Sequence, residues 1–141
     1  SLTMSLASAE SSQLAEAIAV VQAFMHELAA RNLDAATAVL TTDFKMTATG
    51  GHVFTRLADF AAFSRQRNRG VKKTDLGMDA CFLSEAEHGP QVVVYIFGTM
   101  AGEWVDGIAF ANVRYLDRFV VRGARIAAMD IYSDMAEHRG A

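Results

Sequence analysis

The sequence predicts an α+β domain in which three N-terminal helices pack on one face of a curved, mainly antiparallel sheet. Three observations lead to this prediction. Apolar residues recur at helical spacing between residues 10 and 30, and they alternate along extended runs after Val71. The 141 residues, 52% of them hydrophobic, also suffice for one packed core. We therefore expect a single domain over residues 1–141, with residues 1–9 forming a flexible or cloning-derived start.

Three stretches have the spacing of amphipathic helices. The first runs from about residue 10 to residue 30, and its apolar stripe contains Leu14, Ile18, Val21, Met25 and Leu28. Asn32 is placed to cap a short helix over residues 33–40, because its side chain accepts hydrogen bonds from free backbone N–H groups. Thr55 is placed to cap the third helix, whose buried stripe contains Leu57, Phe60 and Ala61.

The remaining segments have the pattern of strands and turns. Phe44, Met46 and Ala48 alternate with polar residues, and a Gly-Gly turn at residues 50–51 predicts a short hairpin with residues 52–54. After residue 71, alternating runs are separated by turns at residues 88–90, 106–107 and 121–124. These runs predict a four-stranded antiparallel meander.

The long strand at residues 91–105 is apolar on both faces, so its spacing does not decide which face is inward. A strand that is apolar on both faces of a half-covered sheet favours a second subunit on the outer face. We therefore expect a homodimer that forms through the outer face of the sheet.

The final strand pair carries the best chemical lead. Successive side chains of a strand point to opposite faces, and the less charged row of the first strand contains Ala109, Ala111, Val113, Tyr115, Asp117 and Phe119. In the second strand the inward row contains Ala127, Met129 and Ile131. Asp117 is thus an inward carboxylate next to an inward phenol, Tyr115.

Several classes of function are not favoured. The net charge of −3 provides no general attraction to nucleic acid or to an anionic membrane. Cys81 is the only cysteine, which excludes an internal disulfide and a cysteine zinc cluster. The four histidines lack metal-ligand spacing, and no glycine-rich phosphate loop occurs, so we expect neither a metal nor a cofactor. The basic run at residues 65–73 either binds an anion or RNA or is a solvated set of cations at the end of a helix.

Residues 1–6 lack the basic and apolar segments of a secretory signal, and no apolar run approaches the length of a membrane span. A cytoplasmic location is therefore the expectation.

The order of elements, together with the ending RYLDRFVVRGARIAAMDIYSD, resembles the nuclear transport factor 2-like (NTF2-like) superfamily, which includes SnoaL-like proteins. The resemblance covers residues 14–134. It implies a cone-shaped roll of the cystatin-like type, in which a strongly bent sheet wraps the first helix and leaves an apolar pocket. It also implies homodimers. Activity varies within this superfamily and has to be argued from the pocket residues.

Matching this sequence to ketosteroid isomerases argues against their mechanism. Phe24 stands where these enzymes carry a tyrosine on the first helix, and Ala48 stands where they carry the general-base aspartate. Tyr115 stands at the position of their protonated aspartate, and also at that of the histidine of SnoaL-type cyclases. Ile131 stands where limonene epoxide hydrolases carry an aspartate. Neither Phe24 nor Ala48 can transfer a proton, so a standard ketosteroid isomerase reaction is not expected.

The predicted pocket takes a small apolar or aromatic molecule, and its lining contains Phe24, Met46, Ala48, Val113, Met129 and Ile131. Asp117 is either a desolvated general acid or base, with Tyr115 donating to a carbonyl or enolate oxygen, or a residue without a catalytic role. In the second case it is paired with an arginine such as Arg31 or Arg56, or lies at a strand end in water. His52 is either a second acid–base or lid residue or an exposed loop histidine. Trp104 either caps the pocket or a dimer edge or is simply buried.

Two functions follow from these alternatives. The first is a cofactor-independent enzyme, of the isomerase, cyclase or dehydratase type, that performs acid–base chemistry on an apolar carbonyl compound. The second is a non-catalytic ligand-binding or dimeric interaction domain.

Overall fold

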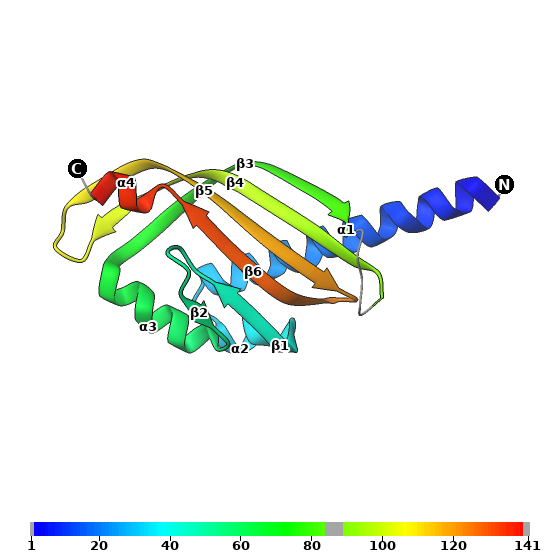
Figure 1. The fold of residues 1–141 in the computed structure, drawn as a ribbon, viewed down its shortest axis with the longest axis horizontal. Coiled ribbons are helices and arrows are strands. Elements are labelled where there is room, and N and C mark those ends of the chain that lie inside the picture. The colour runs from blue at the N-terminus through cyan, green and yellow to red at the C-terminus, as the bar shows by residue number, and fades with distance from the viewer. Residues whose placement is uncertain (1, 84–88, 140–141) are drawn as a thin grey trace. The chain divides into compact units, whose positions relative to one another are not determined.

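The computed structural model of the chain describes residues 2–83 and 89–139, with side chains from residue 8 onward (Figure 1). It confirms the predicted α+β class. The helices are α1 (Leu2–Ala29), α2 (Leu33–Ala38), α3 (Leu57–Arg67) and α4 (Met135–Arg139). The strands are β1 (Leu40–Thr47), β2 (Val53–Phe54), β3 (Asn68–Phe82), β4 (Gln91–Trp104), β5 (Ala109–Arg122) and β6 (Arg125–Ser133).

The strands form a sheet in the order β2-β1-β6-β5-β4-β3. Strands β3 to β6 are neighbours in chain order, which confirms the predicted meander. The predicted hairpin is also present, because β1 and β2 pair antiparallel with Met46 opposite Phe54. Strands β1 and β6 run parallel: Ile126 N near the start of β6 donates to Val39 O, just before the start of β1. The sheet is therefore mixed.

The contacts of the chain group into two units. The first unit comprises residues 1–44, 79–94 and 119–128, and the second comprises residues 45–78, 95–118 and 129–141. The long strands β3 to β6 contribute residues to both units. A single domain over residues 1–141, with a flexible start at residues 1–9, stays a prediction.

In the first unit, α1 buries Ala17, Val21 and Phe24, the last two with no solvent exposure. The other residues of the predicted stripe are only half-buried: Leu14, Ile18, Met25 and Leu28. The Phe24 ring meets the Phe119 ring of β5 edge to face, with the ring centroids 6.2 Å apart. The helix begins at Leu2 and not near residue 10, because the preceding residues are mostly Ala, Ser, Leu and Met, several of them strong helix formers. Residues 2–9 lack a clear apolar repeat at helical spacing, so the sequence pattern did not predict this part of the helix.

Neither predicted capping side chain acts as a cap, although Asn32 lies at the predicted position. Asn32 occupies the N-cap of α2, but its side chain makes no capping hydrogen bond; only its backbone oxygen accepts from Ala36 N. The N-cap of α3 is Arg56 instead of Thr55, and the backbone oxygen of Arg56 accepts from the N–H groups of the first turn. In both helices backbone carbonyls alone begin the helical hydrogen bonding.

Strand β5 confirms most of the predicted inward row but not its beginning. Val113, Tyr115 and Asp117 are buried, as are Phe119 and Val121 further along. Ala109 and Ala111 are exposed, contrary to the prediction, whereas Phe110 is buried against the Trp104 ring, 4.9 Å away between centroids. The reason is Asn112, whose φ of 58° shifts the alternation by one residue. Asparagine tolerates this left-handed conformation better than most residues.

Strand β4 answers two questions that the sequence left open: which of its faces is inward, and what Trp104 does. From residue 94 onward, Val94, Ile96 and Met100 are buried, whereas Phe97 is 39% exposed, so the even-numbered side chains of this part of β4 face the interior. At the start of the strand both faces are buried, with Val93 at 2% exposure. Trp104 is buried, at 5% exposure, and the Arg139 guanidinium lies 5.0 Å from its ring centroid. Burial is thus the correct interpretation of Trp104.

Candidate functional site

Asp117 lies in the middle of β5 and is fully buried, with a relative exposure of 0%. Its Oδ2 accepts a hydrogen bond from Lys73 Nζ of β3 at 2.7 Å, whereas the Lys73 side chain is 29% exposed. Its Oδ1 has no hydrogen-bond partner among the residues that the structure describes. A buried carboxylate oxygen without a partner is costly, so Oδ1 marks a place where a further donor is favourable.

Tyr115 lies two residues before Asp117 on the same face and is 3% exposed. Its hydroxyl donates a short hydrogen bond to Asp75 of β3. Lys73 Nζ lies 4.7 Å from the centroid of the Tyr115 ring, close enough for a cation–π contact. Four side chains, Lys73, Asp75, Tyr115 and Asp117, therefore form one cluster, which lies entirely in the second unit. We call it the Lys73–Asp117 cluster.

The cluster joins two strands that are not neighbours, because β4 lies between β3 and β5 (Figure 1). Adjacent strands lie about 4.8 Å apart, so these side chains span roughly twice that distance. Gly98 of β4 makes this possible. A Cβ atom at Gly98 would lie 3.0 Å from the Tyr115 hydroxyl and 2.0 Å from the Thr74 carbonyl oxygen. The missing side chain leaves room for the contacts between β3 and β5.

Replacing Gly98 with alanine is therefore expected to lower the free energy of unfolding by about 1–3 kcal/mol, because the added methyl group overpacks a site closed by backbone. Thr99→Ala, at the next position of β4, is the matched control and is expected to change stability much less. Urea unfolding of both variants measures the difference. Equal stability of Gly98→Ala and the wild type would show that the strands separate easily at this point.

Burial sets the protonation of the cluster. Desolvation raises the pKa of Asp117; the Lys73 ammonium partly opposes this shift and the charge of Asp75 adds to it. Burial also raises the pKa of Tyr115 well above its ordinary value, with further contributions from the hydrogen bond to Asp75 and from the charges of Asp75 and Asp117. Tyr115 therefore stays a neutral phenol at physiological pH, whereas Asp117 takes up a proton at a higher pH than a solvated aspartate.

The raised pKa of Asp117 has a predicted effect on stability. Between the unfolded pKa of 3.8 and the higher folded pKa, the folded state binds more protons than the unfolded state. The contribution of Asp117 to stability is therefore present at low pH and is lost as the pH rises through this range. Other shifted carboxyls, at Asp43, Asp106 and Asp134, have lowered pKa values, mainly through hydrogen bonds, and act in the opposite direction.

Comparison with Asp117→Asn isolates this effect, because the other carboxyls are common to both proteins. The wild type is expected to lose stability relative to the variant as the pH rises from about 4, by up to about 1.4 kcal/mol per pH unit within the window. Urea unfolding at a series of pH values measures this slope. A constant stability difference between the two proteins from pH 4 to pH 8 would contradict it.

The structure brings the two predicted catalytic residues together, but with other partners than expected. Asp117 pairs with Lys73 and not with Arg31 or Arg56. Arg31 follows α1 in a left-handed conformation, with a φ of 63°, and Arg56 is the N-cap of α3, so neither lies on a strand that faces Asp117. The Tyr115 hydroxyl donates its hydrogen bond to Asp75, whereas it was expected to donate to a ligand oxygen.

The predicted lining residues are interior residues. Met46, Ala48, Val113 and Met129 are buried in the second unit and Ile131 is half-buried there. Phe24 is buried in the first unit. Their contact with a ligand stays a prediction.

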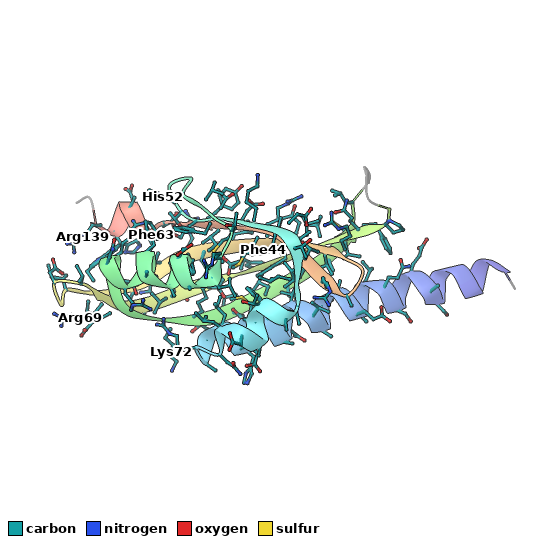
Figure 2. The ribbon with its side chains drawn as sticks, turned by 90° about the horizontal axis from the view of Figure 1, so that it is seen from below. Phe44, His52, Phe63, Arg69, Lys72 and Arg139 are labelled. Atoms are coloured by element: carbon teal, nitrogen blue, oxygen red, sulfur yellow. The ribbon has the colours of Figure 1, made fainter. Side chains whose placement is uncertain are left out.

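Lys73 and Asp75 were missed by the sequence analysis, which grouped Lys73 with the basic run at the end of the third helix. Helix α3 ends at Arg67, and Lys73 lies within β3. The available signal was a repeated spacing: Lys73 and Asp75 are two residues apart on one strand, as Tyr115 and Asp117 are on another. Lys72, between Val71 and Lys73, is exposed and projects away from the ribbon (Figure 2).

His52 contacts α3 and not the residues of the Lys73–Asp117 cluster. The residue is exposed, and its ring contacts the Phe63 ring of α3 at a tilt of 46°, with the centroids 4.7 Å apart (Figure 2). Arg67 also lies against Phe63, 5.2 Å from the ring centroid. These contacts agree with an exposed loop histidine that holds the β1–β2 hairpin against α3.

The described residues offer neither a metal site nor a membrane-spanning helix. No group of three or more His, Cys, Asp or Glu side chains in residues 2–83 and 89–139 is arranged to hold a metal ion. Within the same residues, no helix is both long enough and apolar enough to span a membrane.

Comparison with solved structures identifies the fold. An NTF2-like protein from Burkholderia pseudomallei superposes with a TM-score of 0.66 at 16% identity, over 86% of this chain and 93% of that protein. The chain has the NTF2-like fold. No protein-family model matches its sequence, and no curated protein sequence matches it. The solved structures thus confirm the NTF2-like resemblance that the sequence indicated.

Two other structural neighbours carry more specific names. TerC, crystallised with polyporic acid, superposes with a TM-score of 0.67 at 14% identity and covers 89% of this chain and 96% of its own. A candidate SnoaL-like polyketide cyclase from Jannaschia superposes with a TM-score of 0.68 at 12% identity, over 91% of this chain and 92% of that protein. At these identities the likeness establishes the fold alone.

Proposed function

We propose that this NTF2-like protein binds a small apolar or aromatic carbonyl compound beside Asp117 and exchanges a proton with it. The observation that carries the proposal is the Asp117 carboxylate, which is fully buried, held by Lys73 through one oxygen and without a partner at Oδ1 among the described residues. Such an oxygen is a suitable general base for a weakly acidic C–H group, because its desolvation raises its basicity.

The surroundings support an apolar ligand. Met46, Val113 and Met129 are buried apolar residues of the same unit, and with Ala48 and Ile131 they are proposed to contact the ligand. Lys73 is 29% exposed and provides further N–H donors at the open side of the cluster. A carbonyl oxygen near Lys73 would acquire negative charge as Asp117 removes a proton, and the ammonium group would stabilise that charge.

The names of the structural neighbours agree with this class of ligand. One was crystallised with polyporic acid and another is a candidate polyketide cyclase. The proposed chemistry needs no cofactor and would be of the isomerase, cyclase or dehydratase type.

Deuterium exchange tests the proposal. The protein is incubated with 2-tetralone, an aromatic ketone with acidic α-hydrogens, in deuterium oxide, and the loss of the α-proton signal is followed by NMR. We expect exchange above the buffer rate that falls by about 10²-fold or more in Asp117→Asn. Asp130→Asn is the matched control. Asp130 pairs with Arg118, the residue after Asp117 on β5, whose side chain points to the opposite face of the sheet. Exchange that survives in Asp117→Asn would contradict the role of Asp117.

The second candidate is a non-catalytic binding domain, which is favoured by one observation: the Tyr115 hydroxyl is already engaged by Asp75 and so does not serve a ligand oxygen. In this case 2-tetralone raises the melting temperature by mass action, and its α-protons exchange no faster than in buffer. The same samples therefore separate binding from catalysis.

We also propose that the protein forms a homodimer through the outer face of the sheet. The support is exposed apolar surface in the second unit: Leu76 is 67% exposed and Phe97 is 39% exposed. Leu76→Lys with Phe97→Lys is expected to convert the dimer to a monomer in sedimentation velocity, and a wild type that sediments as a monomer at micromolar concentration would refute the dimer. A cytoplasmic location stays a prediction from the sequence.

A further inference from the structure

Lys73 differs from an ordinary surface lysine in its surroundings. Its Nζ lies 2.7 Å from a carboxylate with no solvent exposure, yet its own side chain is 29% exposed. A small molecule can therefore reach an amine whose direct neighbour is a buried proton acceptor. In contrast, Lys72 and Lys45 are exposed, and neither has an ion-pair partner among the described residues.

Asp117 Oδ2, 2.7 Å from Lys73 Nζ, is placed to accept the proton that this nitrogen gives up before it attacks a carbonyl carbon. Burial penalises the charged form of a carboxylate, so a site with 0% exposure favours Asp117 as the proton acceptor. The contact thus provides a nucleophilic amine and an acid at the same position.

We propose that Lys73 is a carbonyl-reactive lysine that forms an imine with a small aldehyde or ketone bound beside Asp117. This inference rests on the proposed function, because it concerns the same ligand class at the same site. It adds a covalent bond between the ligand and the chain.

The step balances within the pair. The neutral Lys73 amine attacks the carbonyl carbon and forms the C–N bond, while the proton held by Asp117 moves to the carbonyl oxygen. Asp117 then accepts the extra proton from nitrogen and returns it to the hydroxyl group, which leaves as water as the nitrogen lone pair forms the C=N bond. The product is a protonated imine beside an Asp117 carboxylate, and no oxidant or reductant is consumed.

The cluster also suits the product. The iminium nitrogen carries one positive charge, as the Lys73 ammonium did at the same position. It faces the Asp117 carboxylate and the Tyr115 ring, whose centroid lies 4.7 Å from Lys73 Nζ. Both contacts stabilise a cation, so the charge balance of the cluster is unchanged by the reaction. The hydrogen bond from Tyr115 to Asp75 keeps the ring in position beneath the nitrogen.

Reductive trapping tests the proposal. The protein is treated with benzaldehyde and sodium cyanoborohydride at pH 7, where hydride transfer to the C=N carbon fixes the adduct as a secondary amine. Peptide mass spectrometry then gives the labelling rate of each lysine. We expect Lys73 to be labelled at least about tenfold faster than Lys72 and Lys45, because only Lys73 has a buried carboxylate in contact with its nitrogen among the described residues to accept its proton.

Two variants identify the cause. In Asp117→Asn the rate at Lys73 is expected to fall to that of Lys72 in the same sample, whereas Asp130→Asn leaves it unchanged. Circular dichroism checks the folding of each variant. The ratio of the labelling rates of Lys73 and Lys72 in the wild type tests the proposal even when a variant does not fold. Equal labelling of Lys73 and Lys72 in the wild type overturns the proposal, and so does selective labelling of Lys73 that persists in folded Asp117→Asn.

The outcome is distinct from that of the deuterium exchange test. Exchange of 2-tetralone that requires Asp117, without selective labelling of Lys73, removes the imine and retains the proposed function. Selective labelling without exchange retains the imine and removes the proton transfer to the ligand.

Discussion

Replacing Lys73 with methionine is expected to lower the free energy of unfolding by about 3–5 kcal/mol at neutral pH, because it leaves the charge of the fully buried Asp117 without a partner. Methionine retains much of the volume and flexibility of the side chain, so packing changes little. Equilibrium urea unfolding at pH 7 measures the loss.

The pH dependence of this loss is as informative as its size. The raised pKa of Asp117 allows the carboxylate to take up a proton as the pH falls, and a neutral carboxyl needs no cation. The cost of Lys73→Met is therefore expected to shrink toward pH 4. Lys72→Met removes the same charge from the adjacent exposed position and is expected to change stability by less than about 0.5 kcal/mol at either pH. Equal losses for the two variants would contradict a buried pair.

Replacing Phe24 with alanine is expected to lower the free energy of unfolding by about 3–5 kcal/mol, because it removes a fully buried ring and leaves a cavity beside Phe119. The edge-to-face contact with Phe119, at 6.2 Å between centroids, is lost in the same change. Thermal and urea unfolding measure the effect.

This variant also separates two interpretations of Phe24. Phe24 was predicted to line a ligand pocket, and the structure places its ring in the core of the first unit. Phe97→Ala, at a position that is 39% exposed, is the matched control and is expected to cost much less. A Phe24→Ala protein of wild-type stability would show that the ring lines an open space and not a packed core.

The fold was predictable from the sequence because its signals are local and repeated. The stripe of α1 and the turns at residues 106–107 and 121–124 each specify an element and its neighbour. The exception is informative: at Asn112 the alternation shifts by one residue, so Phe110 is buried where Ala109 and Ala111 were expected. Only the backbone conformation reveals such a shift.

The site was half predictable. Asp117 and Tyr115 are two residues apart on a strand with a clear inward face, so their proximity follows from alternation alone. Their partners Lys73 and Asp75 come from a strand that is not adjacent, and they reach across β4 where Gly98 has no side chain. A contact between non-adjacent strands depends on the order of strands in the sheet and on a missing Cβ, and neither has a local signal in the sequence.

Asp117 is the residue on which the proposed chemistry depends, and its protonation can be observed directly. The carboxyl carbon of Asp117, assigned by comparison with Asp117→Asn, can be followed by carbon NMR as the pH is varied. We expect its midpoint well above the ordinary value of 3.8, because burial of Asp117 outweighs the opposing effect of Lys73. A midpoint at or below 3.8 would show a solvated or strongly stabilised carboxylate, and would remove both the general base and the proton acceptor for Lys73.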